Sequence, residues 1–577
     1  MEERWGLPIR AWPKRWRPNR WDLLALPLVF GFLALVLWGG MKMGAHYELW
    51  HPLPLSLSPS HLPGYALRTV LRMAAALLLS LGFSLFYATL AAKSRQAEKL
   101  LIPLLDILQS VPILGFLSIT VTGFIALFPG RLLGVECAAI FAIFTSQAWN
   151  MTFSLYQSLR TVPAELVEAA RMFHLSPWRR FWRLEVPHAI PSLVWNTMMS
   201  VSGGWFFVVA SEAITVSGHQ ILLPGIGSYI ALAIARRDLE AIAEAVLVML
   251  VVILLYDQLL FRPLIAWSAR FQPEPPEEAG ALRPWFLLVL QRSRFFDLLQ
   301  TGILALNRKL DAAIPRSRRQ KEERLASGRK GGLERLLDIA LVFAAAAAAL
   351  SIILFIAKGV SADEIGRVFL YGLFTTLRVF VLIAVASLVW VPIGVAIGLR
   401  PRLADKAQPV VQFLAAFPAN LFFPAAVAAI LEFHLNPQIW LSPLMILGTQ
   451  WYILFNVIAG TAAVPLELRL AARNLGVRGF LWWRRIILPA IFPAYVTGAV
   501  TAAGGSWNAS IVAEIVSWGH TTISASGLGA YIARATAVGD PPRIALGITV
   551  LCLYVLAFNR LLWRRLYDLA AERLRLD

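Results

Sequence analysis

Two stretches of this 577-residue chain repeat each other at a constant distance of 302 residues. Residues 162–193 read VPAELVEAARMFHLSPWRRFWRLEVPHAIPSL, and residues 464–495 read VPLELRLAARNLGVRGFLWWRRIILPAIFPAY. Each begins with a proline where a helix can start, continues with about ten helix-forming residues, breaks at Ser176-Pro177 or Gly476, and ends in a proline-containing apolar segment. The pattern predicts a short helix held between two longer ones.

The repeat extends well beyond these stretches. The same offset pairs Pro163–Pro465, Ala169–Ala471, Arg171–Arg473, Gly203–Gly505, Trp205–Trp507, Glu212–Glu514, Gly225–Gly527, Gly227–Gly529, Tyr229–Tyr531 and Asp238–Asp540. Upstream the offset is 306, which pairs Thr69 with Thr375 and Arg72 with Arg378. The chain is therefore a tandem duplication whose second copy has lost four residues between Pro418 and Trp451.

The composition places the chain in a lipid bilayer. It is 58% hydrophobic and 15% charged, which is more apolar surface than a soluble core could hide. Each half offers six apolar runs near the length of about 20 residues that a membrane-spanning helix needs. They lie near 23–41, 66–91, 101–127, 133–158, 190–217 and 241–266, and near 336–357, 371–398, 409–431, 439–463, 490–516 and 543–562.

The even number of spans per half gives both copies the same orientation in the membrane. Such copies are parallel repeats related by an axis along the membrane normal. The predicted fold is an all-α, polytopic membrane protein with 12 transmembrane helices in two parallel six-helix repeats around a pseudo-twofold axis.

The net charge of +19 could suggest a nucleic-acid partner, but the basic residues recur in every second connection instead of forming one patch. This is the positive-inside pattern of membrane proteins. It excludes nucleic acid, leaves lipid as the surrounding partner, and predicts that both termini lie in the cytoplasm.

The duplication also sets the domain boundaries. Residues 1–267 form the first predicted domain, with its conspicuous loop at about 160–189, and residues 334–577 form the second, with its loop at about 463–489. The join, 268–333, contains a segment starting at Trp285 in which charges interrupt apolar residues, as in a helix lying on the membrane interface. A soluble linker helix would have a similar sequence.

The two repeated loops resemble the EAA loop of permease subunits of bacterial ABC importers. The first copy supplies Glu168, Ala169, Ala170 and Arg171 but has His174 where the family has glycine. The second supplies Ala471, Ala472, Arg473 and Gly476 but has Leu470 at the glutamate position. The resemblance implies coupling helices that dock on two separate ATP-binding-cassette subunits, and these differences make two distinct ATPases conceivable.

The fifth predicted span of each half, SGGWFFVVASEAI and GGSWNASIVAEIV, looks like that of nitrate, sulfonate and taurine importer permeases. This resemblance implies a type I importer fold, a location in the bacterial inner membrane, an anion substrate and a binding protein that delivers it from outside. No Gly-Lys dipeptide occurs in the chain, so it has no Walker A loop, and ATP and magnesium are expected in the partner subunits.

Charged and small residues inside the apolar runs mark a candidate translocation path. The set comprises Arg72, Arg378, Gly203, Gly204, Trp205, Glu212, Gly504, Gly505, Trp507, Asn508 and Glu514. We expect Glu212 and Glu514 to pair with Arg72 and Arg378, with the arginines attracting an anion and the glutamates holding helix packing. The arginines could instead only snorkel to the interface, and the tryptophans could be packing residues.

Other functions have less support. The histidines show no metal-binding spacing, no catalytic arrangement is visible, and Cys137 and Cys552 lie in apolar runs as small buried residues do. An ion-gradient-driven secondary transporter with duplicated halves is the main alternative, since Glu212 and Glu514 could bind ions. Such a carrier would not need paired docking helices, and a membrane scaffold would not need duplicated charges inside spans.

Overall fold

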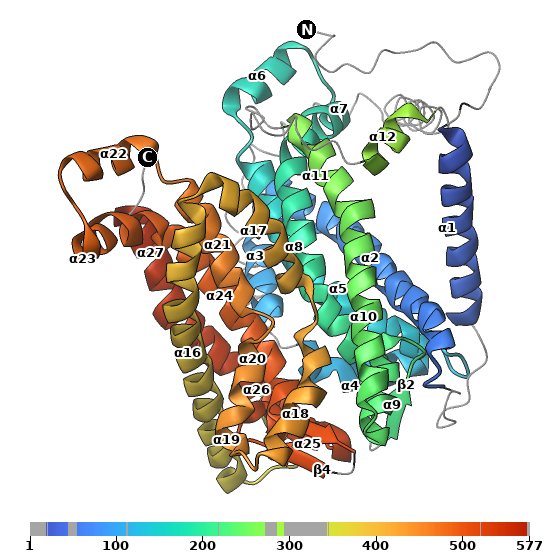
Figure 1. The fold of residues 1–577 in the computed structure, drawn as a ribbon. Helices are drawn as coiled ribbons and strands as arrows, with labels where there is room; N and C mark the ends of the chain where they lie inside the picture. The colour runs from blue at the N-terminus through green and yellow to red at the C-terminus, as the bar shows by residue number, and fades with distance from the viewer. Residues whose placement is uncertain are drawn as a thin grey trace. The chain divides into compact units, whose positions relative to one another are not determined.

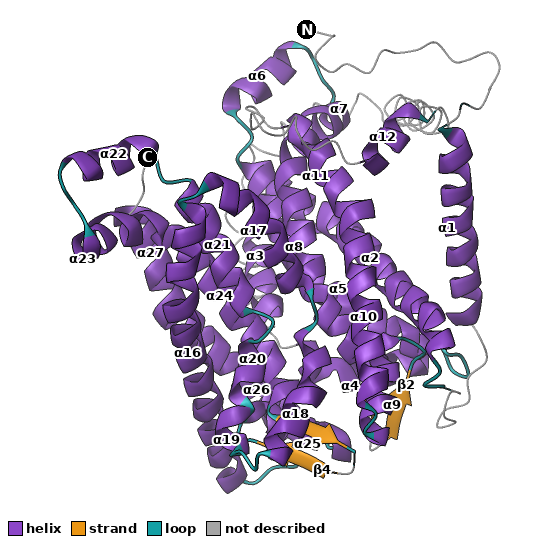
Figure 2. Ribbon diagram, in the orientation of Figure 1, coloured by secondary structure: helices purple, strands orange, loops and turns teal. Residues whose placement is uncertain are grey.

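The structure is a computed structural model that describes residues 19, 21–43, 55–110, 113–216, 219–271, 285–293, 343, 346–519 and 521–573. These residues are mostly helical, with two short β-hairpins (Figure 1, Figure 2). The chain forms two compact units. One comprises residues 1–42, 157–195 and 255–341, and the other comprises 43–156, 196–254 and 342–577.

The described elements of the first half follow one another from residue 22 to residue 292. They are α1 (Asp22–Met43), α2 (Leu62–Lys93), α3 (Arg95–Ser110), α4 (Ile113–Leu127), α5 (Leu133–Arg160), α6 (Ala164–Met172), α7 (Pro177–Arg180), α8 (Val186–Glu212), β1 (Ala213–Val216), β2 (His219–Leu222), α9 (Ile226–Arg236), α10 (Leu239–Tyr256), α11 (Arg262–Ser268) and α12 (Trp285–Arg292).

The second half repeats this order, except that three helices take the place of α5, and the run 439–463, predicted as one span, is bent by 43° after Ile446. Its elements are α16 (Ala362–Gly398), α17 (Pro401–Ala416), α18 (Phe423–Glu432), α19 (Pro437–Trp440), α20 (Ser442–Ile446), α21 (Gln450–Ala462), α22 (Leu466–Asn474), α23 (Gly479–Trp482), α24 (Leu488–Ala513), β3 (Ile515–Trp518), β4 (Thr521–Ser524), α25 (Leu528–Val538), α26 (Pro541–Phe558) and α27 (Arg564–Arg573). Even irregular features recur, because π-helical turns occupy 181–185 and 257–261 and, 302 residues later, 483–487 and 559–563.

Six continuous helical segments in the described residues are long and apolar enough to cross a membrane, and two bent helix pairs raise this number to eight. The chain is thus a multi-pass membrane protein, and the count of 12 spans goes beyond what the helices establish. The span expected near 336–357 falls only partly within the described residues, where an apolar helix covers Ala346–Ala357.

The third predicted span of the second half is wrong as a single helix. The run 409–431 is divided between α17 and α18, which are bent by 72°. Phe417 precedes Pro418 and has an extended backbone, since the ring of a following proline disfavours helix at that position. In the first half α3 ends at Ser110 and α4 begins at Ile113, and the two residues between them lie outside the described residues.

The fifth predicted spans also end earlier than expected. The runs 190–217 and 490–516 were each expected to stay helical, but their last residues are the strands β1 and β3. The β-branched residues Ile214, Thr215 and Val216 favour a strand at this point. Each strand pairs antiparallel with the next one, with Ala213 opposite Leu222 and Ile515 opposite Ser524.

Small residues let the helices of the second half pack closely. A β-carbon on Gly498 of α24 would lie 2.7 Å from the backbone oxygen of Tyr452 in α21. One on Gly394 of α16 would lie 2.7 Å from a methyl carbon of Val457, also in α21. In a bilayer, close van der Waals packing of this kind holds helices together where the hydrophobic effect does not.

The second compact unit has two distinct ends. Helices α22 and α23 precede α24, whereas the hairpin β3–β4 and α25 follow it, so they lie at opposite ends of this helix (Figure 1). The orange strands in Figure 2 mark the hairpin end. In the join, the helix expected from Trp285 is described only as α12, and the remaining residues of 272–342 lie almost wholly outside the described part.

Candidate functional site

The first repeated loop folds as a short helix that ends in a left-handed turn. Helix α6 begins after Pro163 and ends at Met172, and His174 then has a φ of 51°. The backbone NH of Leu175 donates to the carbonyl of Ala170 over 3.0 Å, which closes the turn as a Schellman motif does. His174 therefore takes the conformation that glycine adopts at the same place in related loops, at a cost of about 1 kcal/mol.

The second loop has the same local geometry with the favoured residue in place. Helix α22 begins after Pro465 and ends at Asn474, and Gly476 has a φ of 64°. The NH of Val477 donates to the carbonyl of Ala472 over 2.9 Å. The two loops thus share one backbone design, and only the first bears the strain of a side chain.

Both loops bury one alanine and expose apolar side chains. Ala170 and Ala472 are buried, whereas Glu168, Arg171, Leu470, Ala471 and Arg473 are exposed. Met172 and Phe173 are 79% and 75% exposed, and Leu475 is 80% exposed. Exposed apolar groups on a short loop helix are typical of a surface that contacts another protein.

A buried ion-pair cluster joins four elements of the first half. Thr69 and Arg72 of α2 donate to Oε1 of Glu212, each over 2.7 Å. The other carboxylate oxygen accepts from the NH of Gly227 in α9 over 2.7 Å. Arg72 also donates to both oxygens of Glu136 in α5, over 2.6 and 2.7 Å.

The second half contains the same cluster with one substitution. Thr375 and Arg378 donate to Oε1 of Glu514 over 2.8 and 3.1 Å, and the NH of Gly529 donates to Oε2 over 2.8 Å. The third partner of Arg378 is the amide oxygen of Gln438, at 2.9 Å, 302 residues after Glu136. The expected pairing of glutamate with arginine is therefore present in both halves, with two carboxylates around Arg72 and one around Arg378.

The Gly-x-Gly sequence after each hairpin makes room for this carboxylate. A β-carbon on Gly225 would overlap the carboxyl group of Glu212, and one on Gly527 would overlap that of Glu514. At Gly227 and Gly529 a β-carbon would strike the backbone carbonyls of α8 and α24. Glycine is needed at all four positions because the α9 and α25 backbones lie directly on the preceding helix.

Sequence reasoning missed four members of these clusters. Thr69 and Thr375 lie three residues before the arginines, on the same helix face, and their duplication was a usable signal. Glu136 and Gln438 carried no such signal, because the two residues differ between the copies.

The other residues of the predicted path differ in exposure: some are buried and others face open space. Trp205 and Trp507 are 1% and 3% exposed, so they pack inside the protein and line no open path in this state. Gly204 is buried, close to Gln147 and Met73. Gly504 faces open space, since nothing lies within 4 Å of where its β-carbon would be.

The two halves touch each other through closely corresponding regions, although the contacting residues Ile113 and Asn420 are one position out of register. The NH of Ile113, at the start of α4, donates to Oδ1 of Asn508 in α24 over 2.9 Å. Reciprocally, Nδ2 of Asn420 donates to the carbonyl of Phe206 in α8 over 3.3 Å. Phe206 is the counterpart of Asn508, so each half binds the fifth-span helix of the other just after its Pro112 or Pro418 position.

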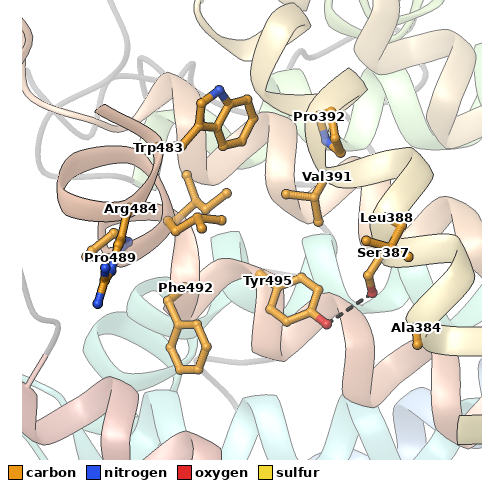
Figure 3. A pocket seen from close by; sticks show the side chains of 12 residues that line it. Ala384, Ser387, Leu388, Val391, Pro392, Trp483, Arg484, Pro489, Phe492 and Tyr495 are labelled. Carbon is orange, nitrogen blue, oxygen red and sulfur yellow. Dashed lines mark hydrogen bonds between the residues drawn. The ribbon is translucent and has the colours of Figure 1, made fainter. Parts of the chain in front are cut away.

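An apolar cavity of about 740 Å³ lies between α16 and the start of α24. Its lining includes Leu388, Val391, Trp483 and Phe492, and the hydroxyl of Tyr495 faces Ser387 at 3.0 Å (Figure 3). Apart from Arg484, the polar side chains of its lining are Ser387 and Tyr495, which bond to each other, so the cavity is mostly apolar.

Comparison with known proteins gives two separate matches. Residues 80–261 and 390–575 each match the family described as "Binding-protein-dependent transport system inner membrane component". Together these segments cover more than half of the chain.

Several curated permeases are similar to parts of the chain. The bicarbonate transport system permease protein CmpB of Synechocystis is 27% identical over 264 residues, or 42% of this chain and 89% of the relative. The nitrate import permease protein NrtB of Leptolyngbya laminosa is 26% identical over 184 residues, or 32% and 62%. The glycine betaine/proline betaine permease protein ProW of Escherichia coli is 31% identical over 137 residues, or 24% and 36%.

For some relatives the shared region is partial. The match to CmpB of Synechococcus elongatus spans 46% of that protein. The doubled family match nevertheless follows the duplication, and each matched segment contains one of the repeated loops and the glutamate of one ion cluster. The chain is a member of the binding-protein-dependent transport system inner membrane components and contains that family's domain twice.

Proposed function

We propose that this chain supplies both permease domains of an ATP-driven importer for a small anion. Each half supplies six spans, 12 in all, and the halves enclose one path around a pseudo-twofold axis along the membrane normal. The reciprocal contacts Ile113–Asn508 and Asn420–Phe206 support such an axis, because in each half a residue just after Pro112 or Pro418 binds the equivalent position of the other half's fifth-span helix.

Coupling to ATP hydrolysis resides in the two repeated loops. The observation that carries this proposal is their shared geometry, a nine-residue helix followed by a left-handed residue, with large apolar side chains exposed. In our account α6 and α22 each dock on a separate ATP-binding-cassette subunit in the cytoplasm. Closure of these subunits would move the loops and rock the halves between outward-open and inward-open states.

The relatives named as bicarbonate and nitrate permeases support an anion as the substrate. A binding protein outside the membrane would deliver it to the hairpin ends of the two halves. The relative named as a betaine permease has a different cargo, so the anion is argued from the first two relatives and not from the family alone.

The buried clusters take a structural role in this mechanism. Arg72 has no exposed surface and donates to Glu136, Glu212 and the carbonyl of Pro224, so it presents no charge to a passing anion. We infer that each cluster fixes α9 or α25 to the second-span helix, so that the hairpin end of each half moves as one body. In this account the two arginines hold these helices together and do not attract the substrate.

The test is recruitment of the ATPase. Met172→Glu combined with Leu475→Glu places a charge on each loop at an exposed position, so folding should be preserved. We expect the double variant to lose co-purification with the ATPase encoded beside it, by about tenfold or more, because interface centres tolerate unpaired charge poorly. ATP-dependent anion uptake by proteoliposomes should fall in parallel.

Val538→Glu is the matched control. Val538 is 79% exposed and ends α25, at the opposite end of α24 from α22, so this variant should recruit the ATPase normally. Normal recruitment by the double variant would refute the proposed coupling.

A further inference from the structure

A polar cavity of about 330 Å³ opens at the hairpin end of the second half. Its walls are the first turns of α16 and α25, which lie with α19 and β4 at the same end of this unit (Figure 1). The polar side chains of its lining on which the inference rests are Arg367, Tyr371, Gln438, Ser524, Ser526 and Arg534. At about 30 Å³ per water molecule, the volume holds a small ion together with several waters.

Two guanidinium groups in this cavity, those of Arg367 and Arg534, form no ion pair with another described residue, although Arg367 lies close enough to Glu364 to interact with its charge. The ion pairs formed by the described residues around the cavity involve Arg378 and Arg543, and none includes Arg367 or Arg534. Glu364, the acidic residue of the lining, is already bound by Arg543 over 2.8 and 3.1 Å and by the hydroxyl of Tyr531 over 2.9 Å. Its charge is therefore offset, and the cavity keeps an excess of positive charge.

Hydroxyl donors complete the site. Ser524 accepts a hydrogen bond from Arg534, and Ser526 accepts one from Nε2 of Gln438 over 3.2 Å. Because each serine oxygen is the acceptor in these bonds, its own proton can be donated to a ligand. Guanidinium forks and hydroxyl groups together are the donors that oxyanions bind, often in a bidentate manner.

The first half lacks these groups at the equivalent positions. His61 stands for Arg367, Leu232 for Arg534, Leu222 for Ser524 and Pro224 for Ser526. Glu136 stands for Gln438 and is fully buried against Arg72, whereas Gln438 is exposed. The same scaffold thus carries two arginines and two serines in the second half and a histidine, two leucines and a proline at the equivalent positions of the first.

We propose that this cavity binds a small oxyanion and that only the second half of the chain has such a site. Arg367 and Arg534 would hold the anion from two sides, and Ser524 and Ser526 would donate to it. Arg378 and Gln438, beneath them, position Ser526. This inference goes beyond the proposed transport function, since it requires binding alone and neither ATP nor a partner subunit.

The experiment is equilibrium binding to the full chain in lipid nanodiscs, without ATPase or binding protein. Sodium nitrate and sodium sulfate serve as probes in separate calorimetric titrations. We expect saturable binding of at least one of them. The variant Arg367→His/Arg534→Leu, which installs the residues of the first half, should raise the dissociation constant by about tenfold or more, as expected for the loss of two charge-assisted contacts.

Two further variants keep the test decisive. Arg560→Gln/Arg565→Gln removes the same charge from exposed positions beyond α26 and should bind as the unmodified chain does. Gln438→Glu adds one carboxylate without removing an arginine and should weaken binding. Absence of saturable binding by the unmodified chain, or equal affinity in the Arg367→His/Arg534→Leu variant, would overturn the proposal, while ATPase recruitment could still be intact.

Discussion

The buried cluster around Arg72 and the one around Arg378 are built from the same parts but differ in charge. In the first half the arginine lies between Glu136 and Glu212, and all three side chains have no exposed surface. In the second half the arginine binds one glutamate and one neutral amide, and its side chain is 14% exposed. After duplication both halves kept the arginine–glutamate pair that connects the helices. The second partner of the arginine changed from Glu136 in the first half to Gln438 in the second.

This difference shows which part of the cluster the fold requires. The threonine, the glutamate, the arginine and the Gly-x-Gly segment are present in both halves, and together they connect the second and fifth spans with the helix after the hairpin. The position of Glu136 and Gln438 was able to change because it lies at the edge of that set. At this position the second half is exposed to solvent, whereas the first half is buried.

Removing the arginines should give the largest difference between the halves. Arg72→Met leaves two carboxylates buried without a cation and should lower the unfolding free energy by about 3–5 kcal/mol. Arg378→Met leaves one carboxylate, which keeps its bonds to Thr375 and Gly529, and should cost about 1–3 kcal/mol. Unfolding in detergent, followed by tryptophan fluorescence, measures both losses, and equal losses would show that the clusters do not differ as described.

Substituting the shared glycines should instead affect both halves alike. Gly227→Ala and Gly529→Ala each force a methyl group into the backbone of the preceding helix and should cost about 1–3 kcal/mol. Gly504→Ala, which meets nothing within 4 Å, is the control and should be close to neutral. The same unfolding assay applies. If only one of the two glycines proved sensitive, the common scaffold would be in doubt.

Exchanging the divergent partners should produce smaller effects of opposite sign. Glu136→Gln removes one charged acceptor from buried Arg72 and should destabilise the chain by about 1.5–3 kcal/mol at most. Gln438→Glu adds a carboxylate beside partly exposed Arg378 and should stabilise it by no more than about 1 kcal/mol. Shifts in the same direction for both variants, measured as apparent melting temperatures, would be inconsistent with this account of the charge difference.

The two loops should show the smallest contrast. His174→Gly removes left-handed strain and should stabilise the end of α6 by about 1 kcal/mol, whereas Gly476→Ala should destabilise the end of α22 by a similar amount. Hydrogen exchange of the backbone amides in each loop measures these changes in local stability directly. Unchanged protection in both variants would mean that the turn is not under strain.

Much of the fold follows from the sequence because hydropathy and duplication are strong signals. The long helices α2, α8, α16 and α24 lie where apolar runs predicted them, and the loop helices α6 and α22 begin at the expected prolines. Hydropathy did not predict the positions at which a change of backbone conformation interrupts an apolar run. It did not divide the run at Pro418, and it did not distinguish the strand at Ile214 from a continuing helix.

The site was predictable only where both copies kept the same residue. Glu212 with Arg72 and Glu514 with Arg378 could be paired because both pairs recur at fixed offsets. The cation-lined cavity could not be predicted, since Arg367 and Arg534 match His61 and Leu232 and gain meaning only when folding brings their helices together. Divergence within the repeat is therefore informative only after the structure is known.

Site-specific cross-linking tests the central claim most directly. In a chain with Cys137 and Cys552 replaced by serine, a single cysteine at Met172 or at Leu475 is exposed on one loop only. Our account predicts that each cysteine, tested separately, forms a cross-link to an ATP-binding-cassette subunit in the assembled complex, and that Val538→Cys does not. Failure of both loop cysteines to cross-link, in a complex that still imports the anion, would contradict it.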